Sequence, residues 1–552
     1  MSKNESPTRR GAKSAAGLAT RARRVPSPGP ARDEARSGPG LLLVLSLSFV
    51  LGFGFLGTRG LGEPDEGRYV GAALEMLASG QYLVPTLGDT PHLTKPPLTY
   101  WLSAAGMFVL GRNEWGARVF LGLVFAAHVL VVLGLGSSLG GRAFGRIAAL
   151  MFATMLMPFV GASLVTTDAL LALWESAAVA CFVVHWHVAP TKPPAIWLVG
   201  MWGAFGLAFL TKGPPGLLPL VAIGSFAVWQ SSPGGGVRSL ARLAHPVGLV
   251  LFAALGLSWF TILAMTQPEA IEGLLRQEVW DRVLGGGHGR NTQWFKPLTM
   301  YLPTLALGSL PWSVAVPLLL WRRRRAANAT RMTLDPAERR LAWLWLLVPF
   351  AVFCLARSRQ LLYLLPLFTP LALLGADVVA SWLDRRPVRG EGGWRRWMSA
   401  TAIAWAGMLL ALRLISAEVA SPRDARQVAE FVRPHFDPAA DVLVLATPRY
   451  FGLSLYLPGE IREAGTAEPA EMVGGAPSLG PDHDADSSVR RRLYLARRSQ
   501  LGALADLFER PPPGCRLVTG PHDLLLAVCR TERGPGATPA SARLGRGVSR
   551  LR

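Results

Sequence analysis

Residues 115–139, WGARVFLGLVFAAHVLVVLGLGSSL, and the nearby residues 147–164, IAALMFATMLMPFVGASL, are two apolar stretches separated by a short basic segment. A helix of about 20 apolar residues crosses the hydrocarbon core of a bilayer. Because similar stretches recur along the chain, we predict a mostly α-helical, polytopic membrane protein with about 11 transmembrane helices. The predicted spans are 41–57, 115–139, 147–164, 169–188, 195–211, 214–230, 246–265, 298–320, 341–356, 361–380 and 398–415.

The charge distribution predicts the orientation of these spans. The chain has 552 residues, 50% hydrophobic and 17% charged, with a net charge of +21 that by itself would suggest nucleic acid. However, the basic clusters fall in residues 1–40 and in alternate loops, which the positive-inside rule explains without a nucleic-acid partner. We therefore expect a cytoplasmic N-terminus, a retained signal anchor at 41–57, and a multi-pass protein of the bacterial inner membrane.

The predicted spans and the charge distribution together divide the chain into regions. Residues 1–40 are expected to be a disordered basic arm, and 41–417 a transmembrane domain whose external loop 58–114 contains two helices at the membrane surface. Eleven spans that begin inside end outside, so 418–530 is predicted to be a small extracytoplasmic α/β domain, followed by a disordered tail at 531–552. Cys515 and Cys529 flank a predicted hairpin in that domain and could pair there.

The first external loop contains Glu63-Pro64-Asp65-Glu66-Gly67-Arg68-Tyr69. In a helix that begins near Pro64, Asp65 lies three and four residues before Arg68 and Tyr69, so that one face offers a carboxylate, a guanidinium and a phenol. The alternative is helix-end chemistry, in which Asp65 and Glu66 complement the positive end of the helix dipole.

A second polar segment, Leu93-Thr94-Lys95-Pro96-Pro97-Leu98, lies in the same loop. Lys95 is either a snorkelling residue at the interface or an ammonium group that binds a lipid phosphate.

Further polar residues end spans on the same predicted face. Asp168 either caps a span or belongs to a site, and Lys212 is either an interfacial anchor or a site cation. Arg359 precedes the tenth predicted span, and Tyr363 lies at its beginning. Together these loops supply two acids and several cations on the face where the positive-inside rule does not place cations.

These residue types suit group transfer from a polyprenyl-phosphate donor to a hydroxyl acceptor. Arg68 and Lys95 would hold the leaving phosphate, and Asp65 would act as the general base that deprotonates the hydroxyl. No Cys/His metal spacing occurs in the sequence, so no metal or other cofactor is expected.

The motifs D-E-G-R-Y, T-K-P-P-L-x-Y-W, G-x-N-E-x-x-x-R (Gly111 to Arg118), T-T-D, T-K-G, G-S-L-P-W and S-R-x-x-x-Y-L-L-P follow one another over about 58–380. In this order they resemble the bacterial aminoarabinose transferases of lipid A and their protein O-mannosyltransferase relatives. These GT-C glycosyltransferases use polyprenyl-phosphate sugars.

The resemblance implies an undecaprenyl-phosphate donor and an acceptor on the periplasmic face: a lipid A-like glycolipid, another cell-envelope glycan or a protein. It implies that Asp65 is the catalytic base and Asp168 the second external acid. Arg68, Lys95, Lys212 and Tyr363 would hold the donor phosphate or line its cavity. The supporting residues would be Glu66, Tyr69, His92, Glu278 and Arg359.

The chain departs from the family pattern at three places. Thr94 stands where the aminoarabinose transferases have a Glu, Val279 follows Glu278 where they have a His, and His92 replaces an aromatic hydroxyl. The first two changes remove a possible metal contact, and the sugar and the acceptor are not determined by the sequence. The alternative functions are a lipid or solute flippase or transporter, which would need charges deep within spans, and an assembly scaffold that acts through 418–552.

Overall fold

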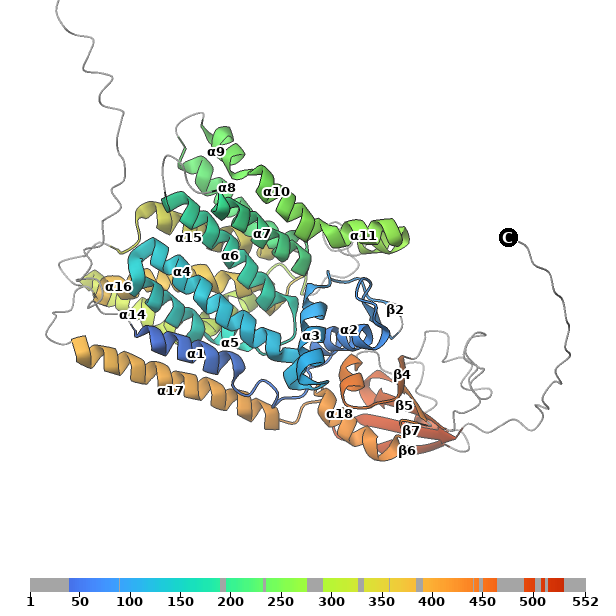
Figure 1. Cartoon of the computed structure of the whole chain (residues 1–552). Coiled ribbons are helices and arrows are strands. Elements are labelled where there is room, and N and C mark those ends of the chain that lie inside the picture. The colour runs from blue at the N-terminus through green and yellow to red at the C-terminus, as the bar shows by residue number, and fades with distance from the viewer. Residues whose placement is uncertain are drawn as a thin grey trace, which may run out of the picture. The chain divides into compact units, whose positions relative to one another are not determined.

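The structure is a computed structural model, and many of its elements are labelled in Figure 1. It describes residues 39–88, 90–188, 195–231, 235–275, 291–325, 332–356, 358–383, 391–439, 441–445, 450–463, 491–501, 508–511 and 515–530. Residues 1–38 of the arm predicted at 1–40, the predicted tail at 531–552 and the site candidate Glu278 lie outside the described residues.

The chain divides into two compact units. The helical unit comprises the residues up to Arg59 together with Ala72–Thr86 and Pro91–Val419. The α/β unit comprises Gly60–Gly71, Leu87–Thr90 and the residues from Ala420 onward. The segment that contains Asp65 and Arg68 is therefore grouped with the C-terminal part of the chain.

The helical unit consists of helices of very different lengths, and α2 begins in the other unit. The helices are α1 (Leu41–Phe53), α2 (Asp65–Ser79), α3 (Leu98–Leu110), α4 (Glu114–Thr154), α5 (Leu156–Gly161), α6 (Thr167–Val188), α7 (Ile196–Lys212), α8 (Leu218–Trp229), α9 (Gly236–Leu243), α10 (Pro246–Phe252), α11 (Ser258–Thr266), α12 (Pro268–Leu275), α13 (Leu302–Gly308), α14 (Trp312–Arg325), α15 (Pro336–Leu355), α16 (Phe368–Leu383) and α17 (Glu391–Glu418). Short 3-10 turns, Pro214–Leu217 and Leu361–Leu367, precede α8 and α16. Two short π-helical segments, Ala253–Leu257 and Pro297–Tyr301, precede α11 and α13.

Helix α4 contains the apolar stretch 115–139 and the first part of the stretch 147–164, which continues in α5. Its 41 residues would extend about 60 Å if straight, which is twice the thickness of the hydrocarbon core. Gly141 interrupts it with φ 85° and ψ 172°, a conformation open to glycine because it has no Cβ. A Cβ on Gly136 would lie 2.8 Å from Cα of Gly145, so the chain folds back into a closely packed helical hairpin. The first predicted span and the beginning of the second thus form the two arms of one hairpin.

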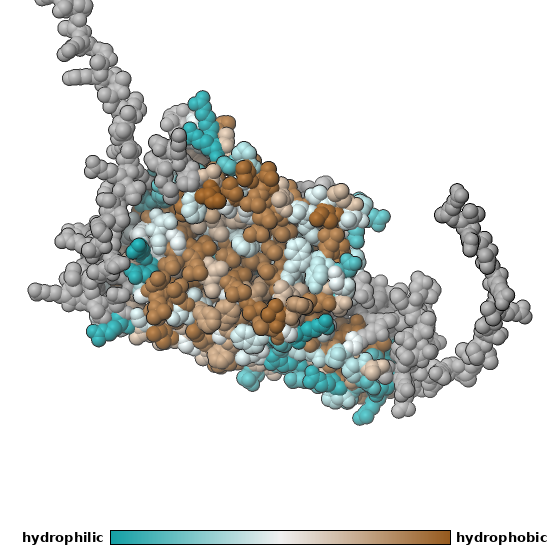
Figure 2. All heavy atoms as spheres, in the orientation of Figure 1, coloured by the Kyte–Doolittle hydropathy of each residue, from teal (hydrophilic) through white to brown (hydrophobic). Residues whose placement is uncertain are grey.

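Among the described residues, five helical segments are long and apolar enough to cross a membrane, and a bent pair makes a sixth. They are Glu114–Thr154, Thr167–His187, Pro246–Thr266, Leu361–Leu383 and Arg396–Glu418, and the pair Pro297–Gly308 and Trp312–Arg325 is bent by 82°. Shorter apolar helices include α1, α3 and α7. Figure 2 shows apolar side chains covering much of the visible face of the helical unit; the exposed residues include Leu123, Leu130, Val250 and Leu355. Such a surface is unusual for a soluble monomer and suits a bilayer. The count of eleven spans stays a prediction.

Both helices predicted in the external loop are present. Helix α2 follows Pro64 and is followed by Gly80 with φ 72°, and α3 follows the Pro96-Pro97 pair. Ser103 of α3 donates a hydrogen bond to the carbonyl of Ala117 in α4 (3.1 Å), so α3 packs against that helix.

The α/β unit is built on a five-stranded sheet with the order β4-β3-β5-β7-β6. Strand β3 is parallel to β4 and β5, whereas β7 is antiparallel to both β5 and β6. Alternate residues of the central strands face two apolar clusters, one of which includes helix α18. The elements are α18 (Ala425–Val432), β3 (Asp441–Leu445), β4 (Glu460–Glu463), β5 (Arg491–Arg497), β6 (Cys515–Thr519) and β7 (Leu524–Arg530), and a small separate hairpin pairs β1 (Thr86–Leu87) with β2 (Thr90–Pro91). The sequence also predicts strands at 441–446 and at about 491–496. The structure has these strands as β3 and β5 and the predicted hairpin as β6–β7, and residue 446 lies outside the described residues.

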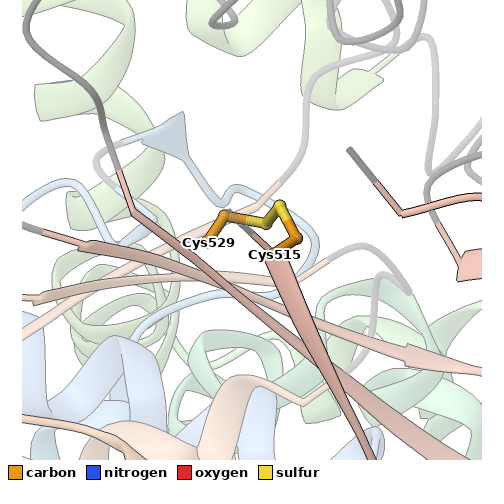
Figure 3. The surroundings of a disulfide bond; sticks show 2 residues. All are labelled: Cys515 and Cys529. Carbon is orange, nitrogen blue, oxygen red and sulfur yellow. A yellow bond between two sulfur atoms is a disulfide. The ribbon is translucent and has the colours of Figure 1, made fainter. Parts of the chain in front are cut away.

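Cys515 and Cys529 form a disulfide across the β6–β7 hairpin (Figure 3). They are directly paired residues in the strand register, and their Cα atoms are 4.0 Å apart. The pairing that the sequence left open is therefore present in the structure.

Candidate functional site

The carboxylate of Asp65 lies in the first turn of α2, where acidic residues complement the helix dipole. Its side chain forms an ion pair with Arg68, three residues later, and Arg68 also donates from Nε to the carbonyl of Pro64 (3.3 Å). The side chain of Asp65 is 54% exposed, so the carboxylate remains accessible to a reacting hydroxyl. The pair predicted by the i, i+3 spacing is confirmed.

Glu66 and Tyr69 support this first turn in different ways. Glu66 is buried, and its Oε2 accepts a hydrogen bond from the backbone N–H of Gly62 (2.8 Å). This contact satisfies a donor just before the helix, as the acid of a capping box does. Tyr69 is half-buried. Glu66 therefore has a structural role in holding the turn that presents Asp65.

Lys95 lies in the helical unit, between β2 and α3. Its Nζ donates to the carbonyl of Thr94 (2.7 Å), and the hydroxyl of Thr94 is 3.0 Å from Nε2 of His92. The Lys95 side chain is half-buried and folds back on its own loop. His92 and Thr94 thus shape the loop that carries the Lys95 ammonium group.

Asp168, Lys212 and Tyr363 meet in a second cluster of the helical unit. Asp168 begins α6, Lys212 ends α7, and Tyr363 lies in the 3-10 turn before α16. Lys212 forms an ion pair with Asp168, and its Nζ lies 4.2 Å from the centroid of the Tyr363 ring. The side chains of Lys212 and Asp168 are only 8% and 6% exposed. Three residues that are far apart in sequence are therefore brought together, as the motifs suggested.

A third acid, Glu175, lies near this cluster and was not among the residues predicted for the site. Glu175 is 2% exposed and lies on α6 seven residues, or two turns, after Asp168. It is close enough to Lys212 and Asp168 to interact electrostatically with both. An acid within an apolar span, at i, i+7 from a candidate site residue, was the signal available in the sequence.

Buried arginines mainly hold backbone in the helical unit. Arg359, predicted as a supporting site residue, is 6% exposed and donates to the carbonyls of Asn291 (2.8 Å), Gln293 (3.0 Å) and Cys354 (2.9 Å). Two further buried arginines, Arg118 and Arg413, were not among the predicted site residues. Arg118 donates to the carbonyls of Leu56 and Arg59, and Arg413 to those of Leu51, Gly54 and Phe159. These two cations thus satisfy carbonyl groups at and beyond the end of α1 and, at Phe159, one in α5.

The candidate site residues therefore form two groups, one in each compact unit. In the α/β unit, Asp65 pairs with Arg68; in the helical unit, Asp168, Lys212 and Tyr363 cluster, and Lys95 bonds within its own loop. Within the described residues, no group of three His, Cys, Asp or Glu side chains is arranged to hold a metal ion.

Comparisons with known proteins agree with this architecture. Residues 94–259 match a family model described as dolichyl-phosphate-mannose-protein mannosyltransferase. An undecaprenyl phosphate-alpha-4-amino-4-deoxy-L-arabinose arabinosyl transferase of Sodalis glossinidius is 32% identical over 348 residues, which cover 61% of this chain and 58% of the relative. A relative with the same description from Pseudomonas fluorescens is 28% identical over 64% of this chain and 59% of its own length. The match thus spans about three fifths of the length of these relatives.

The fold is shared with two crystal structures of ArnT from Cupriavidus metallidurans. One is bound to undecaprenyl phosphate and the other is in the apo state, with TM-scores of 0.66 and 0.65. Each is 21% identical to this chain and aligns over 88% of this chain and 97% of that chain. The predicted resemblance to the aminoarabinose transferases and the protein mannosyltransferases is confirmed.

Proposed function

We propose that this chain is an inner-membrane glycosyltransferase that moves a sugar from a polyprenyl-phosphate donor, such as undecaprenyl phosphate, to a hydroxyl acceptor at the periplasmic face. The acceptor class comprises lipid A-like glycolipids, other envelope glycans and proteins. In this reaction Asp65 takes the hydroxyl proton, the oxygen attacks the anomeric carbon, and the bond from that carbon to the phosphate oxygen breaks. The polyprenyl phosphate leaves with its negative charge met by Arg68 and Lys95.

The observation that carries the proposal is the Asp65–Arg68 pair at the start of α2. A general base must be reachable by the hydroxyl that it deprotonates, and Asp65 is the exposed partner of this pair. Arg68 places a guanidinium, which suits a phosphate group, three residues from the base. One helical turn thus offers both a base for the acceptor hydroxyl and a cation for the leaving phosphate, which suits this transfer.

The cations of the helical unit support the donor-binding part of the proposal. Lys95 provides an ammonium group on a loop bounded by prolines. Lys212 is held by Asp168 and lies over the ring of Tyr363, so its position is fixed before any ligand arrives. Fixed charges stabilise a developing anion without reorganisation during the reaction. We assign Lys95 to the donor phosphate, and Lys212 with Tyr363 to the wall of the donor cavity.

The proposed topology has about eleven spans and a cytoplasmic N-terminus, with 41–417 as the membrane domain and 418–530 as a periplasmic domain. The segregation of basic loops supports this orientation. The disulfide in the C-terminal domain also suits an oxidising compartment.

The test is Asp65→Asn in the full-length protein, reconstituted in vesicles with an undecaprenyl-phosphate sugar and a panel of envelope acceptors. The amide cannot act as a base, so we expect transfer to fall by about 10²- to 10⁴-fold. The measurement is the joint release of polyprenyl phosphate and formation of a glycosidic bond, followed by mass spectrometry.

Asp523→Asn is the matched control, since Asp523 is exposed and its φ of 62° is tolerated by Asn. Its activity should equal that of the unmodified protein. Unimpaired transfer by Asp65→Asn would contradict the role of the base. Movement of unchanged solute, without a new bond, would contradict the enzyme and support a transporter.

A further inference from the structure

The segment that carries Asp65 and Arg68 is built into the α/β unit by backbone hydrogen bonds. Gly62 and Asp424 form an antiparallel bridge. The N–H of Glu63 donates to the carbonyl of Arg423 (2.7 Å), and the N–H of Ala425 donates to the carbonyl of Leu61 (3.0 Å). The partners are separated by about 360 residues in the sequence. Residues 61–63 therefore pair, like a short strand, with the segment that precedes α18.

A side-chain contact of Glu63 fixes the same segment farther along. Glu63 is only 5% exposed, and its Oε1 accepts a hydrogen bond from the backbone N–H of Gly452 (2.6 Å). Its other oxygen, Oε2, is buried and has no hydrogen-bond partner. The buried Oε2 atom without a hydrogen bond lowers the stability of the folded protein. Glu63 is two residues before Asp65.

Two glycines leave the space that the Glu63 carboxyl group occupies. A Cβ on Gly452 would lie 2.8 Å from Oε1 of Glu63 and 3.2 Å from Cα of Gly67. A Cβ on Gly67 would overlap the Glu63 carboxyl group itself. Neither glycine has a positive φ, so the close approach of the carboxyl group, rather than backbone conformation, accounts for them. The first turn of α2, the Glu63 side chain and the backbone at Gly452 therefore pack as one piece.

We propose that Glu63 is a positioning residue through which the C-terminal α/β unit holds the segment bearing the general base Asp65 and the phosphate-binding Arg68. This assignment rests on the proposed function and gives the C-terminal unit a part in it. Glu63 touches neither donor nor acceptor in this scheme. It acts by fixing where the first turn of α2 begins.

The electrostatics around Glu63 agree with this role. Burial raises the pKa of Glu63 to about 8, and the neighbouring Glu66 carboxyl also raises it, whereas the N–H groups of Gly452 and Phe451 and the charge of Arg68 lower it. Tyr450 lies close enough on the C-terminal side to interact electrostatically with Glu63, and burial raises the pKa of its hydroxyl as well. Near neutral pH the docked Glu63 is thus mainly a neutral acid. An exposed Glu is already ionised from pH 4.5 upward, so docking weakens as the pH rises from about 4.5 to about 8.

The first experiment measures docking directly, by hydrogen exchange on the full chain in lipid nanodiscs. In Glu63→Ala, we expect the amides of Glu63, Ala425 and Gly452 to exchange about tenfold faster, since their hydrogen bonds depend on the docked segment. Glu63→Gln keeps the size and the Oε1 acceptor and should keep the protection. Glu430→Ala, at an exposed position on α18, is the matched control. Unchanged protection in Glu63→Ala would overturn the proposal whether or not the chain is a transferase.

Gly67→Ala tests the same contact from the other side. The added methyl group displaces the Glu63 carboxyl group, while alanine favours the helix more than glycine does, so faster exchange cannot come from a weaker helix. If Gly67→Ala acts through Glu63, the double variant with Glu63→Ala is no worse than Gly67→Ala alone. Gly407→Ala, where a Cβ meets nothing within 4 Å, is the control. Additive effects of the two substitutions would contradict the mechanism.

The transfer assay then separates positioning from general folding. Glu63→Ala should lose activity about tenfold or more with its thermal unfolding temperature little changed, because Asp65 and Arg68 are both misplaced. Glu63→Gln should retain most of the activity and show a flatter decline above pH 7 than the unmodified protein. An equal alkaline decline in both would rule out Glu63 as the group that titrates. If every variant docks as expected but no chain transfers sugar, the proposed function fails while the docking stands.

Discussion

The two acid–cation pairs of this protein differ most in their exposure. Asp65 and Arg68 have side chains that are 54% and 27% exposed, whereas those of Asp168 and Lys212 are 6% and 8% exposed. An exposed pair contributes at most about 1 kcal/mol to stability, because water screens it. Removing one partner of a buried pair lowers the free energy of unfolding strongly, because the remaining charge is neither paired nor solvated. The exposed pair is therefore suited to exchange partners during a reaction, and the buried pair to fix a charge in place.

The difference follows from the elements that carry each pair. Asp65 and Arg68 share one helical turn, so their approach is local and needs no packing around it. Asp168 and Lys212 end neighbouring helices, α6 and α7, and meet only because these helices pack. The Lys212 ammonium group of the second pair also lies over the ring of Tyr363.

The largest expected effect on stability comes from breaking the buried pair. Lys212→Met removes the cation and leaves the carboxylate of Asp168 unpaired, so we expect the free energy of unfolding to fall by about 3–5 kcal/mol. Denaturant titration in detergent, followed by tryptophan fluorescence, measures it. Asp65→Asn, which breaks the exposed pair, should cost less than about 1 kcal/mol in the same assay.

A double variant provides the control for this comparison. Asp168→Asn combined with Lys212→Met removes both charges, so it should be more stable than Lys212→Met alone. Equal losses for Lys212→Met and Asp65→Asn would show that burial does not separate the two pairs.

The sequence predicted the local pair well and the distant one only through motifs. The spacing of Asp65 and Arg68 within one turn predicts their contact directly. The meeting of Asp168, Lys212 and Tyr363 depends on how α6, α7 and the turn before α16 pack, which periodicity does not specify. Only the order of the family motifs grouped them in advance.

The contacts of Glu63 and Arg359 with distant backbone groups could not be predicted from the sequence. Glu63 bonds to Gly452, 389 residues away, through a backbone N–H that any residue could supply. No pattern marks such a donor. Arg359 was predicted to support the site, but its guanidinium binds three backbone carbonyls, and sequence cannot distinguish that use from phosphate binding. The apolar stretches, by contrast, predicted two successive helical segments, because apolar length is a local property, whereas the break at Gly141 was not predicted.

A smaller effect should come from the ring over Lys212. Tyr363→Phe keeps the aromatic face and should change stability little, whereas Tyr363→Leu removes the cation–π contact and should cost about 1–2 kcal/mol. The same denaturant titration measures both variants. A loss in Tyr363→Phe as large as in Tyr363→Leu would show that the hydroxyl, and not the ring, is the partner that matters.

The smallest expected effect on stability is that of Arg68→Ala, and it should depend on salt. The exposed ion pair with Asp65 contributes below about 1 kcal/mol at low ionic strength. At about 1 M salt the Debye length is roughly 3 Å, so this contribution should vanish, while the loss in Lys212→Met persists because that pair is shielded from ions. Denaturant titrations of both variants at low and high salt measure the contrast. In the transfer assay, Arg68→Ala should raise the KM for the polyprenyl-phosphate donor far more than its stability loss suggests, since we propose that the guanidinium binds the phosphate. A large, salt-independent loss of stability with an unchanged KM would mean that Arg68, like Arg359, serves the fold.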